Sequence, residues 1–414
     1  MFEGVKFIVL AFIIDYQCLL IKSLPLNRSA LYLHPLITTD FLFMPYTSLL
    51  EFLIAADPVA VSGDEGYETG QIGWLLQQDN DLELADLVLI GCDEWRGAGP
   101  GAATLNSDSI RQQLYQLYHW HHEIKIADAG TIRTGASLKD TYAALKLVVK
   151  DLVDAGKKVM ILGGSHDCTL PLYHVFADRQ QIIEATVVDA LIDLDKNNHK
   201  QSRRFLLEML TSSPNYVRHF NLIGFQSYFT YPDLLETIDK LRFDCFRVGR
   251  VQEKMDEVEP AIRSSELLSV DMNAVAHAYA PANALSPNGF TGQDMCKLMQ
   301  YAGMSDTNSI TGIFNFAGKD PQNLTAMQVA QMVWYFMDGM QKQRHETHLD
   351  DRTGYNEFHT LCAEVDTLFL QSRNTSRWWM QMPDSKFIAC SFSDYYAASN
   401  NDLPERWLRA QERM

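Results

Sequence analysis

The sequence predicts an α/β protein of three αβα layers, in which helices cover both faces of a mainly parallel, doubly wound sheet. Three observations support this fold class. From about residue 85, short apolar β-rich segments alternate with amphipathic segments of helical period. Strands that alternate with helices at this spacing pair in parallel and are covered on both faces. A composition of 47% hydrophobic and 21% charged residues is ordinary for a globular protein with a sizeable core.

The elements follow in order from this pattern. Residues 85–91 predict a buried strand, and residues 107–120 predict a helix that Ser107 or Asp108 caps. A long helix ends near Gly156, a strand at 158–164 stops at a glycine pair, and a short helix covers 169–177. Further strands are expected at 185–195, 220–225, 246–250, 266–272 and 308–318, followed by a helix at 325–343.

Two flanking segments extend this predicted domain of residues 41–345. In the first, residues 1–40, the apolar run Phe7–Ile14 is much shorter than the roughly 20 residues that span a bilayer, and no small-residue cleavage site follows it. We therefore expect a packed or disordered extension, or a gene start placed too far upstream, rather than a secretory or anchoring segment. The second, residues 346–414, is rich in aromatic residues and predicts a packed C-terminal appendage, with its tryptophans in packing or oligomer contacts.

The charge of the sequence indicates which kinds of partner it can bind, and its cysteines indicate the compartment in which it is expected. The formal net charge of −17 disfavours nucleic acid and anionic membranes as partners, whereas a small-molecule ligand is compatible with it. The seven cysteines are scattered and never form a C-x-x-C pair, so the sequence shows neither a disulfide framework nor zinc-finger spacing. A reducing, cytoplasmic location is expected.

Three segments at predicted strand ends carry the candidate chemistry: GGSHD at 163–167, VDALIDLD at 188–195 and SVDMN at 269–273. In a parallel sheet, functional groups gather at the carboxyl ends of the strands. A single histidine such as His166 is more often a hydrogen-bonded core residue than a ligand, but several aspartates buried together need a cation. One histidine with several aspartates suits Mn²⁺ or Mg²⁺ better than Zn²⁺.

The order and spacing of these segments resemble the three signature motifs of the ureohydrolases, the family of arginase, agmatinase and formimidoylglutamase. Those motifs read approximately Gly-Gly-Asp-His-Ser, Asp-Ala-His-x-Asp, and Ser-x-Asp-x-Asp followed by Ala-Pro, which here is Ala280-Pro281. Residues 86–114 and 221–227 are similar to the family's first strand with its glycine-rich loop and helix, and to its middle strand. The resemblance covers residues 83–342 and is nearest to formimidoylglutamase-like proteins.

The resemblance implies a metal centre that keeps only part of the family's ligands. The family holds two Mn²⁺ ions, and the ligands of one ion are retained as His166, Asp189, Asp193 and Asp271. The other ion loses two ligands, because Leu191 stands in place of a histidine and Asn273 in place of an aspartate. We expect one Mn²⁺ rather than two, with a metal-free protein as the remaining alternative.

The same resemblance implies hydrolysis of a C–N bond in a linear amidine or related small molecule, with Asp193 orienting the attacking hydroxide. Asn315 stands where the family has a glutamate that contacts the substrate. His199 and His277 are the candidates for a proton shuttle, although each is more simply a surface residue. A homo-oligomer is implied by the family alone. The alternative is a catalytically degenerate member that keeps the fold for binding or assembly.

Overall fold

The computed structural model describes residues 49–62, 66–99, 106–283, 285–316, 320–362 and 365–412. The predicted extension, residues 1–40, lies outside the described residues. No helix in these described ranges combines the length and the apolar character that crossing a membrane requires. The six cysteines within them form no disulfide.

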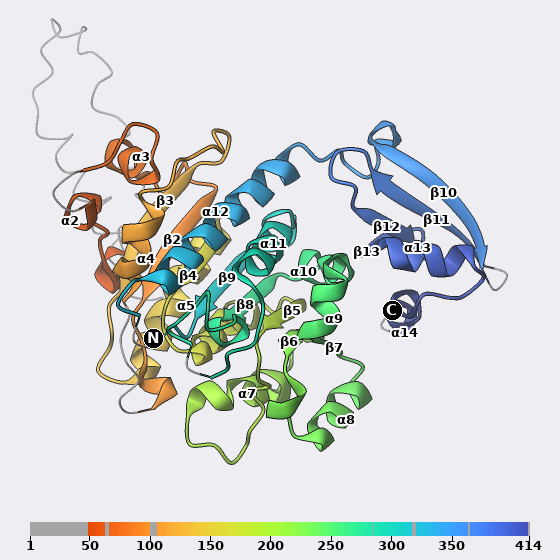
Figure 1. The fold of residues 1–414 in the computed structure, drawn as a ribbon, viewed down its shortest axis with the longest axis horizontal. Coiled ribbons are helices and arrows are strands. Elements are labelled where there is room, and N and C mark those ends of the chain that lie inside the picture. Colours follow the sequence, from red (N-terminus) through yellow and green to blue (C-terminus); the bar gives the residue numbers. More distant parts are fainter. Residues whose placement is uncertain are drawn as a thin grey trace, which may run out of the picture. The chain divides into compact units, whose positions relative to one another are not determined.

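A nine-stranded sheet forms the centre of the protein (Figure 1), in the order β1-β3-β2-β4-β9-β8-β5-β6-β7. Its short edge strand β1 is antiparallel to β3, and all other neighbours are parallel. The strands are β1 (Leu53–Ile54), β2 (Leu87–Cys92), β3 (Ile126–Ile132), β4 (Lys158–Leu162), β5 (Ile183–Val188), β6 (Val217–Phe225), β7 (Asp244–Arg247), β8 (Leu267–Asp271) and β9 (Ile310–Phe314). The predicted α/β fold with a mainly parallel sheet is confirmed.

Helices cover both faces of this sheet because the chain reverses its direction along the strand order. The step from β2 to β3 runs opposite to the step from β3 to β4, so right-handed crossovers place their helices on opposite faces. Accordingly α4 packs with α12, which packs with α11, while α5 packs with α6. The helices are α2 (Pro58–Ser62), α3 (Ile72–Gln78), α4 (Ser107–Leu114), α5 (Leu138–Asp154), α6 (Thr169–Asp178), α7 (Phe205–Thr211), α8 (Pro232–Lys240), α9 (Val248–Glu253), α10 (Glu259–Arg263), α11 (Gly292–Gly303) and α12 (Leu324–Arg344).

Local chemistry explains where the long helix α5 starts and which face it buries. Ser137 and Asp140 form a capping box at its first turn, in which each side chain accepts a hydrogen bond from the other residue's backbone N–H. Buried apolar residues then recur at helical spacing, as at Leu145, Val149 and Leu152. The apolar face therefore packs on the sheet while the opposite face is exposed to solvent.

The C-terminal segment folds into a second, antiparallel sheet with an aromatic cluster. This sheet has the order β10-β11-β12-β13, and two short helices follow it. Trp378 stacks on Tyr395 at 5.0 Å between ring centroids, and the guanidinium of Arg263 lies 4.2 Å above the ring of Trp379. The elements are β10 (Tyr355–Cys362), β11 (Val365–Ser372), β12 (Trp378–Gln381), β13 (Phe387–Cys390), α13 (Phe392–Ser399) and α14 (Glu405–Glu412). The domain boundary after residue 345 stays a prediction.

Several predicted elements are shorter than expected. The strand expected at 185–195 ends at Val188, so Asp189 to Asp195 form a loop. The strand expected at 246–250 ends at Arg247, where α9 begins. The helix expected at 107–120 ends at Leu114, and its cap is Asn106, whose side chain accepts from the backbone N–H of Ser109. The strand β3 was not predicted, because its sequence IADAGTI contains a glycine and a charged residue that both weaken the strand pattern.

Candidate metal centre

The structure brings together four buried side chains at the carboxyl ends of the central strands: His166, Asp189, Asp193 and Asp271. His166 follows β4, Asp189 follows β5 directly, Asp193 lies in the loop beyond it, and Asp271 is the last residue of β8. One ligand atom from each residue lies within 4.8 Å of all the others. The four groups can therefore face a single cation.

A glycine pair makes the sharp turn that positions His166. Gly163 and Gly164 have φ values of 102° and 83°, which residues with a Cβ rarely adopt. A Cβ on Gly163 would lie 2.6 Å from the carbonyl oxygen of Cys92 at the end of β2. The turn after β4 thus needs glycine for both backbone conformation and close approach to the neighbouring strand.

The Nδ1 atom of His166 is the point on which the three carboxylates converge. It lies 3.0 Å from Asp193 Oδ2, 3.1 Å from Asp271 Oδ2 and 3.4 Å from Asp189 Oδ2. On its other side, His166 Nε2 lies 3.0 Å from the hydroxyl of Ser269. When Nε2–H donates to Ser269, the lone pair of Nδ1 faces the carboxylates, which is the form that binds a metal.

Ser269 was missed as a functional residue in the sequence. Its hydroxyl lies 2.6 Å from that of Thr169, so it is held on two sides. The available signal was its place in SVDMN, two residues before Asp271, because alternate residues of a strand share a face. Ser269 therefore orients His166 from the same strand that supplies Asp271.

The electrostatics of the cluster favour a bound cation. Although burial alone would lower it, the surrounding carboxylates, Asp271 foremost, raise the pKa of His166 well above its usual value. Burial, followed by repulsion from Asp271 and Asp193, raises the pKa of Asp189 well above its usual value. Asp189 Oδ2 is also buried without a hydrogen-bond partner. A divalent ion would supply the positive charge and the partner that these oxygens lack, so the donor set fits Mn²⁺.

The remaining oxygens of the cluster are engaged by the chain itself. Asp189 Oδ1 accepts from the backbone N–H of Leu191 at 3.1 Å, and Asp271 Oδ1 accepts from that of Asn273 at 2.7 Å. The side-chain amide of Asn315 donates to both oxygens of Asp271, each at 3.1 Å. The strand β8 ends at Asp271 and a short 3-10 turn follows, so Asn273 does not continue the strand face of Asp271. Substrate binding by Asn315 stays a prediction.

One positively charged residue lies beside the cluster. Arg203 Nη1 is 3.5 Å from Asp193 Oδ1, and 36% of the Arg203 side chain is exposed. Sequence reasoning missed this contact because Arg203 lies ten residues beyond Asp193, in a single 3-10 turn (Gln201–Arg203) that no periodic pattern marks. The shuttle candidates His199 and His277 are both exposed, and His277 Nδ1 lies 2.7 Å from the carbonyl oxygen of Asn283.

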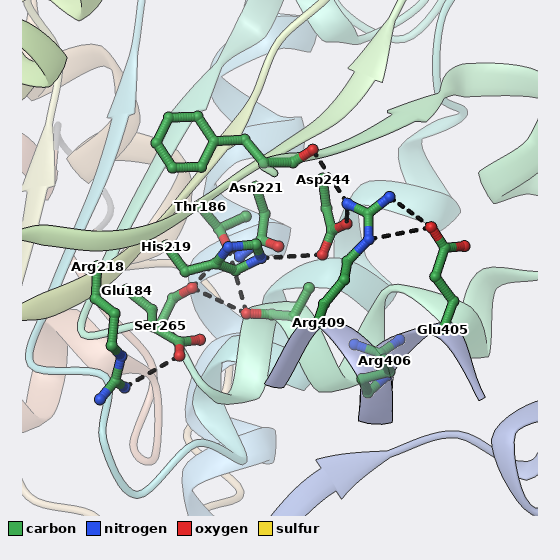
Figure 2. Close-up of polar contacts among 12 residues, drawn as sticks. Glu184, Thr186, Arg218, His219, Asn221, Asp244, Ser265, Glu405, Arg406 and Arg409 are labelled. Atoms are coloured by element: carbon green, nitrogen blue, oxygen red, sulfur yellow. Dashed lines mark hydrogen bonds and ion pairs between the residues drawn. The ribbon is translucent and has the colours of Figure 1, made fainter. Parts of the chain in front are cut away.

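A second group of polar residues lies at the opposite, amino ends of β5, β6 and β7. Figure 2 shows Asp244 between His219, whose Nε2 is 2.9 Å away, and Arg409 of α14. Arg409 also contacts Glu405 and the backbone carbonyl of Phe243. A cleft of about 840 Å³ lies here, between the sheet edge and the C-terminal sheet. We attribute this polar group to attachment of the C-terminal helix.

Comparisons with known proteins agree with this geometry. The family model described as Arginase family matches residues 85–338. No curated protein matches the sequence. Among solved structures, Trypanosoma cruzi formiminoglutamase with Mn²⁺ is 16% identical with a TM-score of 0.58, covering 66% of this chain and 98% of that chain. The agmatine ureohydrolase of Thermoplasma volcanium is 19% identical with a TM-score of 0.53, covering 67% and 96% respectively. A hypothetical agmatinase from Burkholderia thailandensis is 15% identical with a TM-score of 0.52, covering 64% and 89%. At these identities the likeness to solved structures shows a shared fold.

Proposed function

This chain belongs to the arginase family, and from that premise we propose that it is a hydrolase that uses one Mn²⁺ ion to cleave a C–N bond in a linear amidine or related small molecule. The observation that carries the proposal is the buried set of His166, Asp189, Asp193 and Asp271. Three carboxylates and one imidazole in mutual contact form a costly arrangement unless a cation binds among them.

A single ion is favoured by what surrounds the four ligands. Leu191 offers no donor atom where the family has a histidine, and its side chain is 4% exposed. The Oδ1 atoms of Asp189 and Asp271 already accept backbone hydrogen bonds, and Asp271 also accepts from Asn315. These contacts orient the Oδ2 atoms toward His166 and leave few free oxygens for a second ion.

When bound, the ion supplies Lewis acidity that activates water and polarises the substrate. The residues of this chain have separate roles around it. Ser269 holds His166 in the form that presents Nδ1, and Asn315 holds Asp271. Asp193 is the carboxylate placed to orient the attacking water, because its Oδ1 faces the partly exposed Arg203 at the edge of the cluster. With Asn315 in place of the family's glutamate, the site carries less negative charge. Such a site suits a neutral formimino or amide group better than a positively charged guanidinium.

The second candidate is a family member without catalysis, which keeps the fold to bind a ligand or to assemble. The specific observation that favours it is the commitment of Asn315 to Asp271, since an amide that holds a metal ligand is less available to a substrate. Under either candidate we propose a small-molecule ligand, a cytoplasmic location and a homo-oligomer.

Metal analysis combined with turnover tests these candidates. The full chain is stripped with EDTA, reconstituted with Mn²⁺ and analysed for ions per subunit. Release of ammonia, urea or formamide is then measured with arginine, agmatine, formiminoglutamate and guanidino acids. We expect about one ion per subunit, and turnover that Asp193→Asn abolishes and the exposed control Asp195→Asn retains. Absence of turnover with every compound, with or without a bound ion, supports the non-catalytic candidate, and absence of bound metal refutes the Mn²⁺-dependent hydrolase.

A further inference from the structure

The charge of the cluster is not balanced by one divalent ion. Asp189, Asp193 and Asp271 contribute three negative charges when ionised, and His166 is neutral as a metal ligand. One Mn²⁺ therefore leaves a net charge of about −1 in a buried place, which is unfavourable in a low-dielectric environment. A second ion would over-compensate that charge, but its expected ligand positions hold Leu191 and Asn273.

Apart from His166, Arg203 is the one cationic side chain that forms an ion pair with these carboxylates within the described ranges. Its Nη1 lies 3.5 Å from Asp193 Oδ1, while Asp193 Oδ2 faces His166 at 3.0 Å. The carboxylate of Asp193 thus joins the candidate metal position on one side to a guanidinium on the other.

The loop that carries Arg203 is held by its own backbone. The N–H of Arg203 donates to the carbonyl of Lys200, and the carbonyl of Arg203 accepts from the N–H of Asp195, each at 3.1 Å. The closed loop between Asp195 and Arg203 positions the guanidinium at the edge of the cluster. With 36% of its side chain exposed, Arg203 can pair with Asp193 without the full cost of burying an arginine.

We propose that the guanidinium of Arg203 is the second cation of this centre, supplying the positive charge that a second metal ion would otherwise supply. This inference rests on the proposed one-ion function. Arg203 acts through Asp193 and is a positioning residue. Its positive charge balances the loaded site, and the same charge repels Mn²⁺, so the ion binds less tightly than the three carboxylates alone would allow.

The sign of the effect on metal affinity tests the inference. Isothermal titration of the EDTA-treated full chain with Mn²⁺ at low ionic strength is compared among wild type, Arg203→Gln, Arg203→Lys and Arg204→Gln. Arg204 is the matched control, because it is the exposed neighbouring arginine. Removing a charge several ångströms from a divalent ion in a water-rich setting tightens binding by roughly tenfold. We expect that gain for Arg203→Gln at unchanged stoichiometry, with near wild-type affinity for Arg203→Lys and Arg204→Gln.

Salt dependence and folding controls separate this role from a purely structural one. The tenfold gain should shrink at high salt, where charges near solvent are screened. Far-UV circular dichroism of the metal-free variants verifies that each is folded. Unchanged or weaker Mn²⁺ binding by folded Arg203→Gln, with wild type binding one ion, overturns the role of Arg203 and leaves the proposed function standing. Absence of Mn²⁺ binding by wild type overturns both.

Discussion

Replacing Asp189 by asparagine should have opposite effects on the metal-free and the metal-loaded protein. Asp189 is fully buried, its Oδ2 has no hydrogen-bond partner, and burial with two neighbouring carboxylates raises its pKa. Asparagine has nearly the same shape, and its Oδ1 can still accept from the N–H of Leu191. Without metal, the substitution removes one of three buried carboxylates that share the imidazole of His166, and with it the repulsion from Asp271 and Asp193, which should stabilise the fold by about 1–3 kcal/mol.

With Mn²⁺ present, Asp189→Asn should instead lower the free energy of unfolding. The variant loses one of four direct ligands. Loss of a residue that only hydrogen-bonds to a metal ligand already lowers metal affinity about 10–100-fold, so loss of a direct ligand should lower it further. Urea unfolding in EDTA and in saturating Mn²⁺ gives both free energies by linear extrapolation. The exposed Asp195→Asn serves as the control and should change stability by less than about 0.5 kcal/mol in either buffer. A variant that is more than about 1 kcal/mol less stable than wild type in EDTA would refute the reasoning that repulsion among the three carboxylates makes the ionised Asp189 destabilising in the metal-free protein.

Two further predictions concern regions away from the cluster. Burial, with the neighbouring His121 and His122, lowers the pKa of His119 to about 4, so the folded state keeps it neutral while the unfolded state binds a proton below about pH 6.5. This contribution to stability is present above pH 6.5 and is lost as the pH falls toward 4. The free energy of unfolding of wild type should therefore fall between pH 7.5 and pH 4.5 by about 2–3 kcal/mol more than that of His119→Asn. An equal fall in both proteins would contradict the lowered pKa of His119. Arg409→Ala should weaken attachment of α14, because it leaves the Asp244 carboxylate with His219 as its remaining ion-pair partner. We expect faster hydrogen exchange in α14 and about 1–3 kcal/mol lower stability for Arg409→Ala. The exposed Lys240→Ala serves as the control and should show neither change. Equal exchange in both variants would contradict the role of Arg409 in attaching α14.

The fold could be predicted from sequence because its central strands are buried on both faces. Segments such as Leu87–Cys92 and Lys158–Leu162 are almost uninterrupted apolar runs, and this local pattern is present whichever strands become neighbours in the sheet. The strand β3 was missed for the opposite reason. Its residues Asp128 and Gly130 weaken the local pattern, but tertiary contacts stabilise them, since the Asp128 carboxylate pairs with the buried Arg111 at 2.9 Å.

The candidate site was predictable only in part. His166, Asp189 and Asp271 sit at the ends of strands or just after them, so a parallel sheet brings them to one edge whatever the strand order. The contacts of Arg203 and Asn315 depend on one short 3-10 turn and one loop, which are too short for a sequence pattern to fix the direction of their side chains. Asn315 has a φ of 64°, a backbone conformation that no pattern of neighbouring residues indicated.

By itself, the sequence determined the alternation of strands and helices and the kinds of ligand atom available at the strand ends, because apolar periodicity and side-chain chemistry are local properties. Only the tertiary structure decided that Asp189 Oδ2 lacks a hydrogen-bond partner, that Ser269 orients His166, and that Arg203 faces Asp193. Such contacts join residues up to 103 positions apart in the chain. The electrostatic energy of such a contact depends on the distance between the two groups in space. The order of residues along the chain does not specify that distance.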